Sequence, residues 1–184
     1  MTTNSDSPGA PRLKQQSVAS ATWAALSQLQ VAANRTQLDP RLLELVKMRA
    51  SQINGCAFCL ELHARTAVAH GENPARLHVL PAWEEVTLFS PQERAALRWA
   101  EALTRLPAGG VSDEVFAEAS AHFNEQELLE LTLAVIAINS WNRLNVAFRV
   151  APDPNYWPGG KPPAGDAAAR EKVAAGAAAA TVRA

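Results

Sequence analysis

The sequence predicts an all-α protein of about six to eight helices and no β-sheet. Apolar residues recur at the spacing of one helix face in several segments, and helix-start signals precede most of these segments. No segment shows the alternation of apolar and polar residues that is typical of a half-buried strand, and no internal repeat is present. A chain of 184 residues is long enough for one domain with a hydrophobic core.

The composition divides the chain into three parts. Residues 1–16 are polar and contain proline and glycine, so we expect a flexible N-terminal arm. Residues 17–150 hold the helical patterns and form the predicted domain. Residues 151–184 contain a cluster of prolines and glycines followed by an alanine-rich end, which predicts an extended tail.

Two helices are expected before the cysteines. Residues 17–33 are rich in alanine and carry apolar residues at helical spacings. Asp39 is a good N-cap, and Pro40 suits the first helical position, so a second helix is expected to run to Ile53. The apolar stripe of this second helix comprises Leu42, Val46, Ala50 and Ile53.

Glu44 lies on the other side of that second helix. From periodicity alone, we expect a solvent-exposed glutamate that pairs with Lys47. A hairpin between this helix and the next one would bring Glu44 back toward the cysteines, but the pattern does not require it.

The two cysteines of the chain and a histidine form the pattern C-x-x-C-x-x-x-H. Asn54 and Gly55 indicate a turn, and residues 57–69 are predicted to form a helix that ends at Gly71. At 100° per residue, Cys56, Cys59 and His63 share one face. Cys56 is expected in the first turn, where unpaired N–H groups and the helix dipole favour a thiolate.

Three more helices are expected after an irregular piece over residues 73–81 and a turn of helix ending near residue 89. A capping box starting at Ser90 predicts a helix to about residue 106, and Ser112 predicts a short helix to about residue 122. Asn124 and Glu127 begin the last helix, which runs to about Phe148. That helix is apolar nearly all round from residue 128 to residue 138, which is typical of a core helix or a subunit interface.

The spacing of the cysteines leaves three interpretations open. A C-x-x-C pair at a helix start suggests dithiol redox chemistry, although the βαβ frame of thioredoxin is missing. Cys56, Cys59 and His63 with Glu44 or His70 could instead bind zinc, but one helix supplies most of these ligands and closes a tetrahedron poorly. The cysteines could also be inert core residues. We rank redox chemistry first, and we interpret His70 as a favourable charge at a helix end.

Composition also limits the partners and the compartment. The formal net charge is −1 and no basic stripe is present, so nucleic acid is not an expected partner. The N-terminus lacks the features of a secretion signal, and no apolar run is long enough to span a membrane, so we expect a cytoplasmic protein with no membrane association. In a reducing compartment, a close cysteine pair is more often catalytic or metal-binding than structural.

The cysteine motif and its surroundings resemble a known family. Glu44 precedes Cys56 by twelve positions, and Cys56, Cys59 and His63 complete the pattern. This set resembles the core motif of the alkylhydroperoxidase D-like (AhpD-like) proteins of the carboxymuconolactone decarboxylase superfamily. The likeness spans residues 18–150 and includes the segments 43–46, 49–56, 93–97, 99–102 and 138–143.

The resemblance implies an all-α AhpD-like bundle, assembly into homotrimers or homohexamers, and reduction of hydroperoxides by the cysteine pair without a cofactor. It also implies that Glu44 faces the site and forms a proton relay with His63. It further implies that an external dithiol restores the reduced pair, and in the best-known members this dithiol is a lipoyl group on a partner protein. Some members carry a histidine within the C-x-x-C motif, where this chain has Phe58.

The order of the cysteines and two other functions remain open at this point. Cys59 is the slightly favoured attacking thiol because His63 lies one turn away, with Cys56 resolving, and the reverse order is nearly as well supported. A lactone decarboxylase of the same superfamily is one alternative, but those enzymes act without a cysteine pair. A zinc-binding or redox-sensing protein without enzymatic activity is the other.

Overall fold

The computed structural model describes residues 10–12, 19–153 and 155–156. Most of the predicted arm (1–16) and tail (151–184) therefore lies outside the described residues. The described part contains seven α-helices and one 3-10 helix and no strand, which confirms the predicted all-α class. None of its helices is long and apolar enough to cross a bilayer. The elements are α2 (Ser20–Ala33), α3 (Pro40–Asn54), α4 (Ala57–Ala69), α5 (Pro74–Val79), η1 (Leu80–Glu85), α6 (Pro91–Arg105), α7 (Asp113–Ser120) and α8 (Glu125–Phe148).

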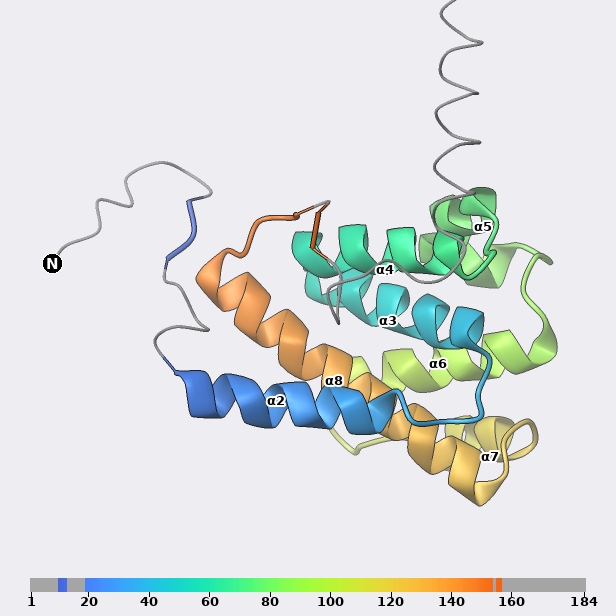
Figure 1. Cartoon of the computed structure of the whole chain (residues 1–184). Coiled ribbons are helices and arrows are strands. Elements are labelled where there is room, and N and C mark those ends of the chain that lie inside the picture. The colour runs from blue at the N-terminus through green and yellow to red at the C-terminus, as the bar shows by residue number, and fades with distance from the viewer. Residues whose placement is uncertain (1–9, 13–18, 154, 157–184) are drawn as a thin grey trace, which may run out of the picture.

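Helix α3 is the centre of the bundle. Helices α4, α6 and α8 all pack against it, while α2 lies along α8 (Figure 1). Seven consecutive residues of α3, from residue 42 to residue 48, are buried. The predicted apolar stripe was therefore too narrow, and its last member, Ile53, is only partly buried. A helix enclosed on all sides must bury its polar side chains as well, and each of these needs a partner.

The predicted helix starts are confirmed by their hydrogen bonds. The Asp39 side chain accepts the N–H of Arg41 at the start of α3. Capping boxes open α6, from Ser90 to Glu93, and α8, from Asn124 to Glu127. These caps satisfy N–H groups that a helix start leaves without intrahelical partners, so local sequence fixes where most helices begin.

The turn between α3 and α4 brings two site-bearing helices together as an antiparallel pair (Figure 1). Gly55 ends α3 in the left-handed conformation, with φ of 66°, which glycine adopts without steric cost. Cys56 follows as the N-cap of α4 and not as a first-turn residue, which corrects the predicted placement by one position. At the other end His70 is the C-cap, and Gly71 comes one residue later with φ of 88°.

The segment predicted to be irregular after residue 72 is helical. Asn73 caps α5 by accepting the N–H of Ala75, and Pro74 occupies the first position of the helix. The 3-10 helix η1 follows directly, and Leu80 and Trp83 are buried in the core beside α3. The prediction missed α5 because six residues are too few for a clear helical period.

The composition of α8 predicted a helix that is buried nearly all round, but only one of its sides is buried in this chain. One side is buried against α3 and α6, including Leu131, Val135 and Ile138. Leu129 and Ile136 are exposed on the other side of this single chain. The prediction of a core helix therefore holds for one side, and the interface alternative stays a prediction for the other.

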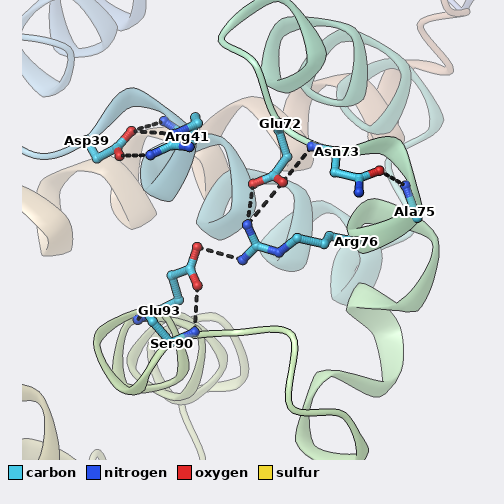
Figure 2. Close-up of polar contacts among 8 residues, drawn as sticks. All are labelled: Asp39, Arg41, Glu72, Asn73, Ala75, Arg76, Ser90 and Glu93. Carbon is cyan, nitrogen blue, oxygen red and sulfur yellow. Dashed lines mark hydrogen bonds and ion pairs between the residues drawn. The ribbon is translucent and has the colours of Figure 1, made fainter.

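A group of charged side chains joins the C-terminal end of α4 to α5 and α6. The Glu72 side chain accepts the N–H of Asn73 at 2.7 Å and pairs with Arg76 at 3.0 Å. Arg76 also binds Glu93 at 2.6 Å, and the other oxygen of Glu93 accepts the N–H of Ser90 (Figure 2). We call Glu72, Arg76 and Glu93 the Glu72 clasp. It links the connection between α4 and α5 to the start of α6 through one guanidinium group.

Candidate redox site

The two cysteines meet at the point where α4 begins. Their sulfurs are 2.7 Å apart and both cysteines are free. Both residues are almost fully buried, beside Ala50 of α3 and Ile138 of α8, with Phe58 partly buried against them. The separation is only slightly longer than a disulfide bond of about 2.05 Å, so the pair can close with little further approach.

Cys56 has the better position for carrying negative charge. Its sulfur accepts the backbone N–H of Cys59 at 3.4 Å and so acts as the N-cap of α4. The hydrogen bond from the Cys59 thiol lowers the pKa of Cys56 to about 7, against the opposing effect of burial, and the Cys59 N–H and the amides of Asn142 and Asn145 add to this lowering. A substantial fraction of Cys56 is therefore thiolate at neutral pH.

The surroundings of Cys59 have the opposite effect and favour its protonated form. Donation of its thiol proton to Cys56 raises the pKa of Cys59, and burial and the charge of Cys56 raise it further. One proton is therefore shared between the two sulfurs, with the charge on Cys56 and the proton on Cys59. This distribution favours Cys56 over Cys59 as the nucleophile, whereas the prediction from the motif slightly favoured Cys59.

A chain of three charged or titratable side chains lies beside the cysteines, and we call it the Glu44 chain. Lys47 Nζ binds Glu44 Oε1 at 2.8 Å, and His63 Nδ1 lies 2.7 Å from Glu44 Oε2. Glu44 and Lys47 are buried, and His63 is nearly so, with 13% of its side chain exposed. The geometry thus brings Glu44 of α3 to His63 of α4, one turn after Cys59.

The prediction from periodicity that Glu44 is solvent-exposed is wrong, while the predicted pairing with Lys47 is observed. Burial by itself would raise the pKa of Glu44, but the charge of Lys47 and the contact with His63 outweigh it and lower the pKa to about 2. Glu44 is therefore ionised at neutral pH and can only accept hydrogen bonds. His63 must then donate through Nδ1, which leaves Nε2 free to exchange a proton.

With this geometry established, three comparisons identify the family. Residues 19–102 match the carboxymuconolactone decarboxylase family profile. The uncharacterised protein YdfG of Bacillus subtilis is 42% identical over 104 residues, which cover 56% of this chain and 71% of YdfG. The chain belongs to the carboxymuconolactone decarboxylase family. This finding confirms the membership predicted from the Glu44, C-x-x-C and His63 motif.

Solved structures agree with this assignment. The crystal structure of ATU0492 from Agrobacterium tumefaciens, a protein of unknown function and an AhpD antioxidant-defence candidate, is 33% identical with a TM-score of 0.76. The match covers 78% of this chain and 99% of ATU0492. The debrominase Bmp8 is 18% identical with a TM-score of 0.66, over 76% of this chain and 75% of Bmp8, and at that identity it shows the fold alone. The AhpD-like helical bundle is therefore the fold of this family member.

Two site residues of this family member were missed at the sequence level. Asn145 Nδ2 lies 3.4 Å from the sulfur of Cys59, and Asn142 is fully buried next to the cysteine pair. Asn142 accepts from Asn54 at 2.9 Å and donates to Ser51 at 3.0 Å, so its amide is fixed from both sides. The available signal was a row of three asparagines spaced three residues apart on α8, at positions 139, 142 and 145, because buried amides need partners.

Other histidines take no part in this site. His70 caps the far end of α4, and His78 and His122 are exposed. Within the described residues, no group of three or more His, Cys, Asp or Glu side chains is arranged to hold a metal ion. The zinc alternative therefore gains no support from the geometry. What the site can do is pass two electrons through its sulfurs and a proton through His63.

Proposed function

We propose that the protein is a thiol peroxidase that reduces alkyl hydroperoxides by a dithiol–disulfide cycle. The observation that carries this proposal is the pair of sulfurs 2.7 Å apart at the N-terminus of α4, one helical turn before a partly buried imidazole that is held by a carboxylate. A thiolate attacks peroxide oxygen far faster than a thiol does, and the hydrogen bonds from the thiol and the backbone N–H of Cys59 lower the pKa of Cys56 and so favour its thiolate.

The first step breaks the peroxide O–O bond. The Cys56 thiolate attacks the terminal oxygen of ROOH, forming the sulfenic acid on Cys56 and releasing RO⁻, which takes a proton to become ROH. We assign this proton transfer to Nε2 of His63, which takes up the proton that Cys56 loses on becoming a thiolate and passes it to RO⁻, because Nδ1 is occupied by Glu44. Sulfur is oxidised by two electrons and the peroxide is reduced by two.

The second step closes the disulfide. Cys59 loses its proton and attacks the sulfur of the sulfenic acid on Cys56, releasing hydroxide that leaves as water. Asn145 donates toward Cys59 at 3.4 Å and stabilises the thiolate needed for this attack. The net reaction converts ROOH and two thiols into ROH, water and one disulfide.

Glu44 acts through His63 in this proposal. Since the pKa of Glu44 is lowered to about 2, the carboxylate stays charged, accepts the hydrogen bond from Nδ1 of His63 and orients the imidazole ring. The family resemblance implied that Glu44 and His63 together form a proton relay. In this proposal His63 alone carries the proton, and Glu44 orients its ring.

The cycle needs an external dithiol that reduces the disulfide by exchange. Following the family resemblance, we propose a dihydrolipoyl group on a partner protein as this reductant. We also propose cytoplasmic action as a homotrimer or homohexamer, without a bound cofactor. A panel of dihydrolipoamide, thioredoxin and glutathione would identify the reductant, and sedimentation would give the subunit number.

The proposal is tested by counting free thiols after adding cumene hydroperoxide to the reduced protein. We expect both thiols to disappear with one equivalent of peroxide, and thiols that persist would refute a peroxidase. Dimedone then assigns the order, because a sulfenic acid persists when its resolving cysteine is missing. We expect labelling in Cys59→Ser; labelling only in Cys56→Ser would restore the order in which Cys59 attacks.

A further inference from the structure

The sulfurs of the redox site have little contact with solvent. Cys56 and Cys59 are 1% and 2% exposed. The cluster that surrounds them includes Ala50 and Ile138, which belong to the central helices and are themselves fully buried. Phe58 is the partly exposed member of this cluster, so its side chain separates the sulfurs from the surface on one side.

A residue from beyond α8 covers Phe58. The chain leaves α8 and returns to the beginning of α4 (Figure 1). There the ring of Tyr156 lies 5.6 Å from the ring of Phe58, at an interplanar angle of 50°. This distance and tilt fall within the range of attractive aromatic pairs. Tyr156 is itself partly exposed, and burial raises the pKa of its hydroxyl, as expected for a ring that lies partly against the protein.

Hydrogen bonds to the backbone of Tyr156 hold it in this position. Arg65 Nη2 donates to the carbonyl of Tyr156 at 2.9 Å and to the carbonyl of Asp153 at 3.5 Å. Glu61 orients the same guanidinium group at 2.8 Å. A turn at Asp153, whose carbonyl accepts the N–H of Tyr156 at 3.0 Å, completes the attachment.

We propose that Tyr156 and Phe58 form an aromatic cover on the thiol pair, and that Tyr156 determines which reagents reach the cysteines. Arg65 anchors this cover on α4, the same helix that carries Cys59 and Phe58. Its two rings, with Ile138 behind them, present an apolar surface to an entering molecule. The cover therefore favours hydroperoxides with an alkyl or aryl group over hydrogen peroxide, which can bury no apolar surface.

Access to the thiols can be measured without any peroxide. The reduced full-length protein is treated with iodoacetamide and with N-ethylmaleimide, and the loss of free thiols is followed over time. We expect Tyr156→Ala to react about 2- to 10-fold faster than the wild type, the change that corresponds to the loss of one aromatic pair. Tyr156→Phe keeps the ring and should react at the wild-type rate.

Two further variants control this experiment. Arg65→Met removes the anchor but keeps both rings, and we expect a change in the same direction as for Tyr156→Ala. Phe116→Ala removes an exposed aromatic residue from α7, and it should leave the alkylation rate unchanged. Thermal unfolding of each variant confirms that its fold is intact. An unchanged rate in folded Tyr156→Ala would overturn the proposal.

The second measurement addresses substrate preference and rests on the proposed function. The rate of thiol oxidation is compared for cumene hydroperoxide and hydrogen peroxide. We expect the ratio of these rates to fall in Tyr156→Ala and to be retained in Tyr156→Phe, and an unchanged ratio would refute the role in preference. If no peroxide oxidises the thiols but Tyr156→Ala still alkylates faster, the peroxidase proposal fails and the aromatic cover stands.

Discussion

Glu44 lies beside the middle of α4 and Glu72 lies just beyond the C-terminal end of α4, and the two are buried to almost the same extent, with 4% and 5% of their surface exposed. Glu72 is bound by a guanidinium group and a backbone N–H, and both of these donors keep their protons at any physiological pH. Glu44 is bound by an ammonium group on one side and an imidazole on the other. Only the second arrangement contains an imidazole, whose two nitrogens can act one as donor and the other as acceptor. A buried carboxylate is thus assigned to structure or to chemistry by its partners and not by its burial.

The largest expected difference between the two carboxylates is in the chemical step. We expect Glu44→Gln to slow the oxidation of the thiols by about 10²–10⁴-fold, the range over which acid–base groups contribute. Glu72→Gln should leave this rate unchanged, because the Glu72 clasp does not touch the sulfurs. Stopped-flow measurement with cumene hydroperoxide gives both rates.

His63→Gln serves as the companion variant, since it removes the imidazole directly and should slow the step at least as much as Glu44→Gln. Circular dichroism shows whether each variant is folded before its rate is interpreted. Equal rates for Glu44→Gln and Glu72→Gln would contradict the assignment of Glu44 to the chemistry.

The next difference is in stability, and it depends on pH. Lys47→Met leaves the charge of Glu44 buried with only His63 as a partner, and we expect a loss of about 3–5 kcal/mol in the free energy of unfolding at pH 7. Arg76→Met should cost less, about 1–3 kcal/mol, because Glu72 keeps the N–H of Asn73. Urea unfolding measures both values.

The pH dependence of Lys47→Met has a defined sign. In the wild type, the lowered pKa of Glu44 contributes stability that is complete above 4.5 and is lost as the pH falls toward 2. Without Lys47, the pKa of Glu44 rises and the carboxylate is protonated at a higher pH. The deficit of Lys47→Met relative to the wild type should therefore shrink as the pH falls from 7 toward 3, and a constant deficit would argue against this account.

The smallest expected effects come from replacing two asparagines, one beside the cysteines and one beside the Glu72 clasp. Asn145→Ala removes a donor to the cysteine pair, and we expect it to raise the pKa of Cys56, now about 7, by up to about one unit. Asn73→Ala removes the cap of α5 beside the Glu72 clasp and should cost about 1 kcal/mol of stability without changing the thiol pKa. The pH dependence of iodoacetamide alkylation reports the first value and urea unfolding the second.

Local sequence signals predicted most of the fold because they act within one turn of helix. Asp39, Ser90 and Asn124 each bind an N–H group two or three residues away, so the helix starts could be read directly. Helix α5 was missed although Asn73 and Pro74 mark its start, because six residues do not show a helical period.

The site was less predictable from periodicity because its contacts join separate helices. Periodicity treats the side of a helix opposite its apolar stripe as solvent, and this assumption fails for Glu44 because α3 is enclosed by α4, α6 and α8. Asn145 reaches Cys59 across 86 positions of sequence, which no local pattern encodes. The family resemblance placed Glu44 at the site where the local pattern could not.

The sulfur of Cys56 has two duties, since the atom that caps α4 is also the atom proposed to be oxidised. A cap works by offering electron density to the free N–H groups of a helix start, and a bridged sulfur offers less of it than a thiolate. Each oxidation should therefore loosen the first turn of α4, and each reduction should tighten it again. Faster amide hydrogen exchange at residues 58 and 59 in the bridged form would reveal a helix end that reports the oxidation state of the protein to whatever binds there.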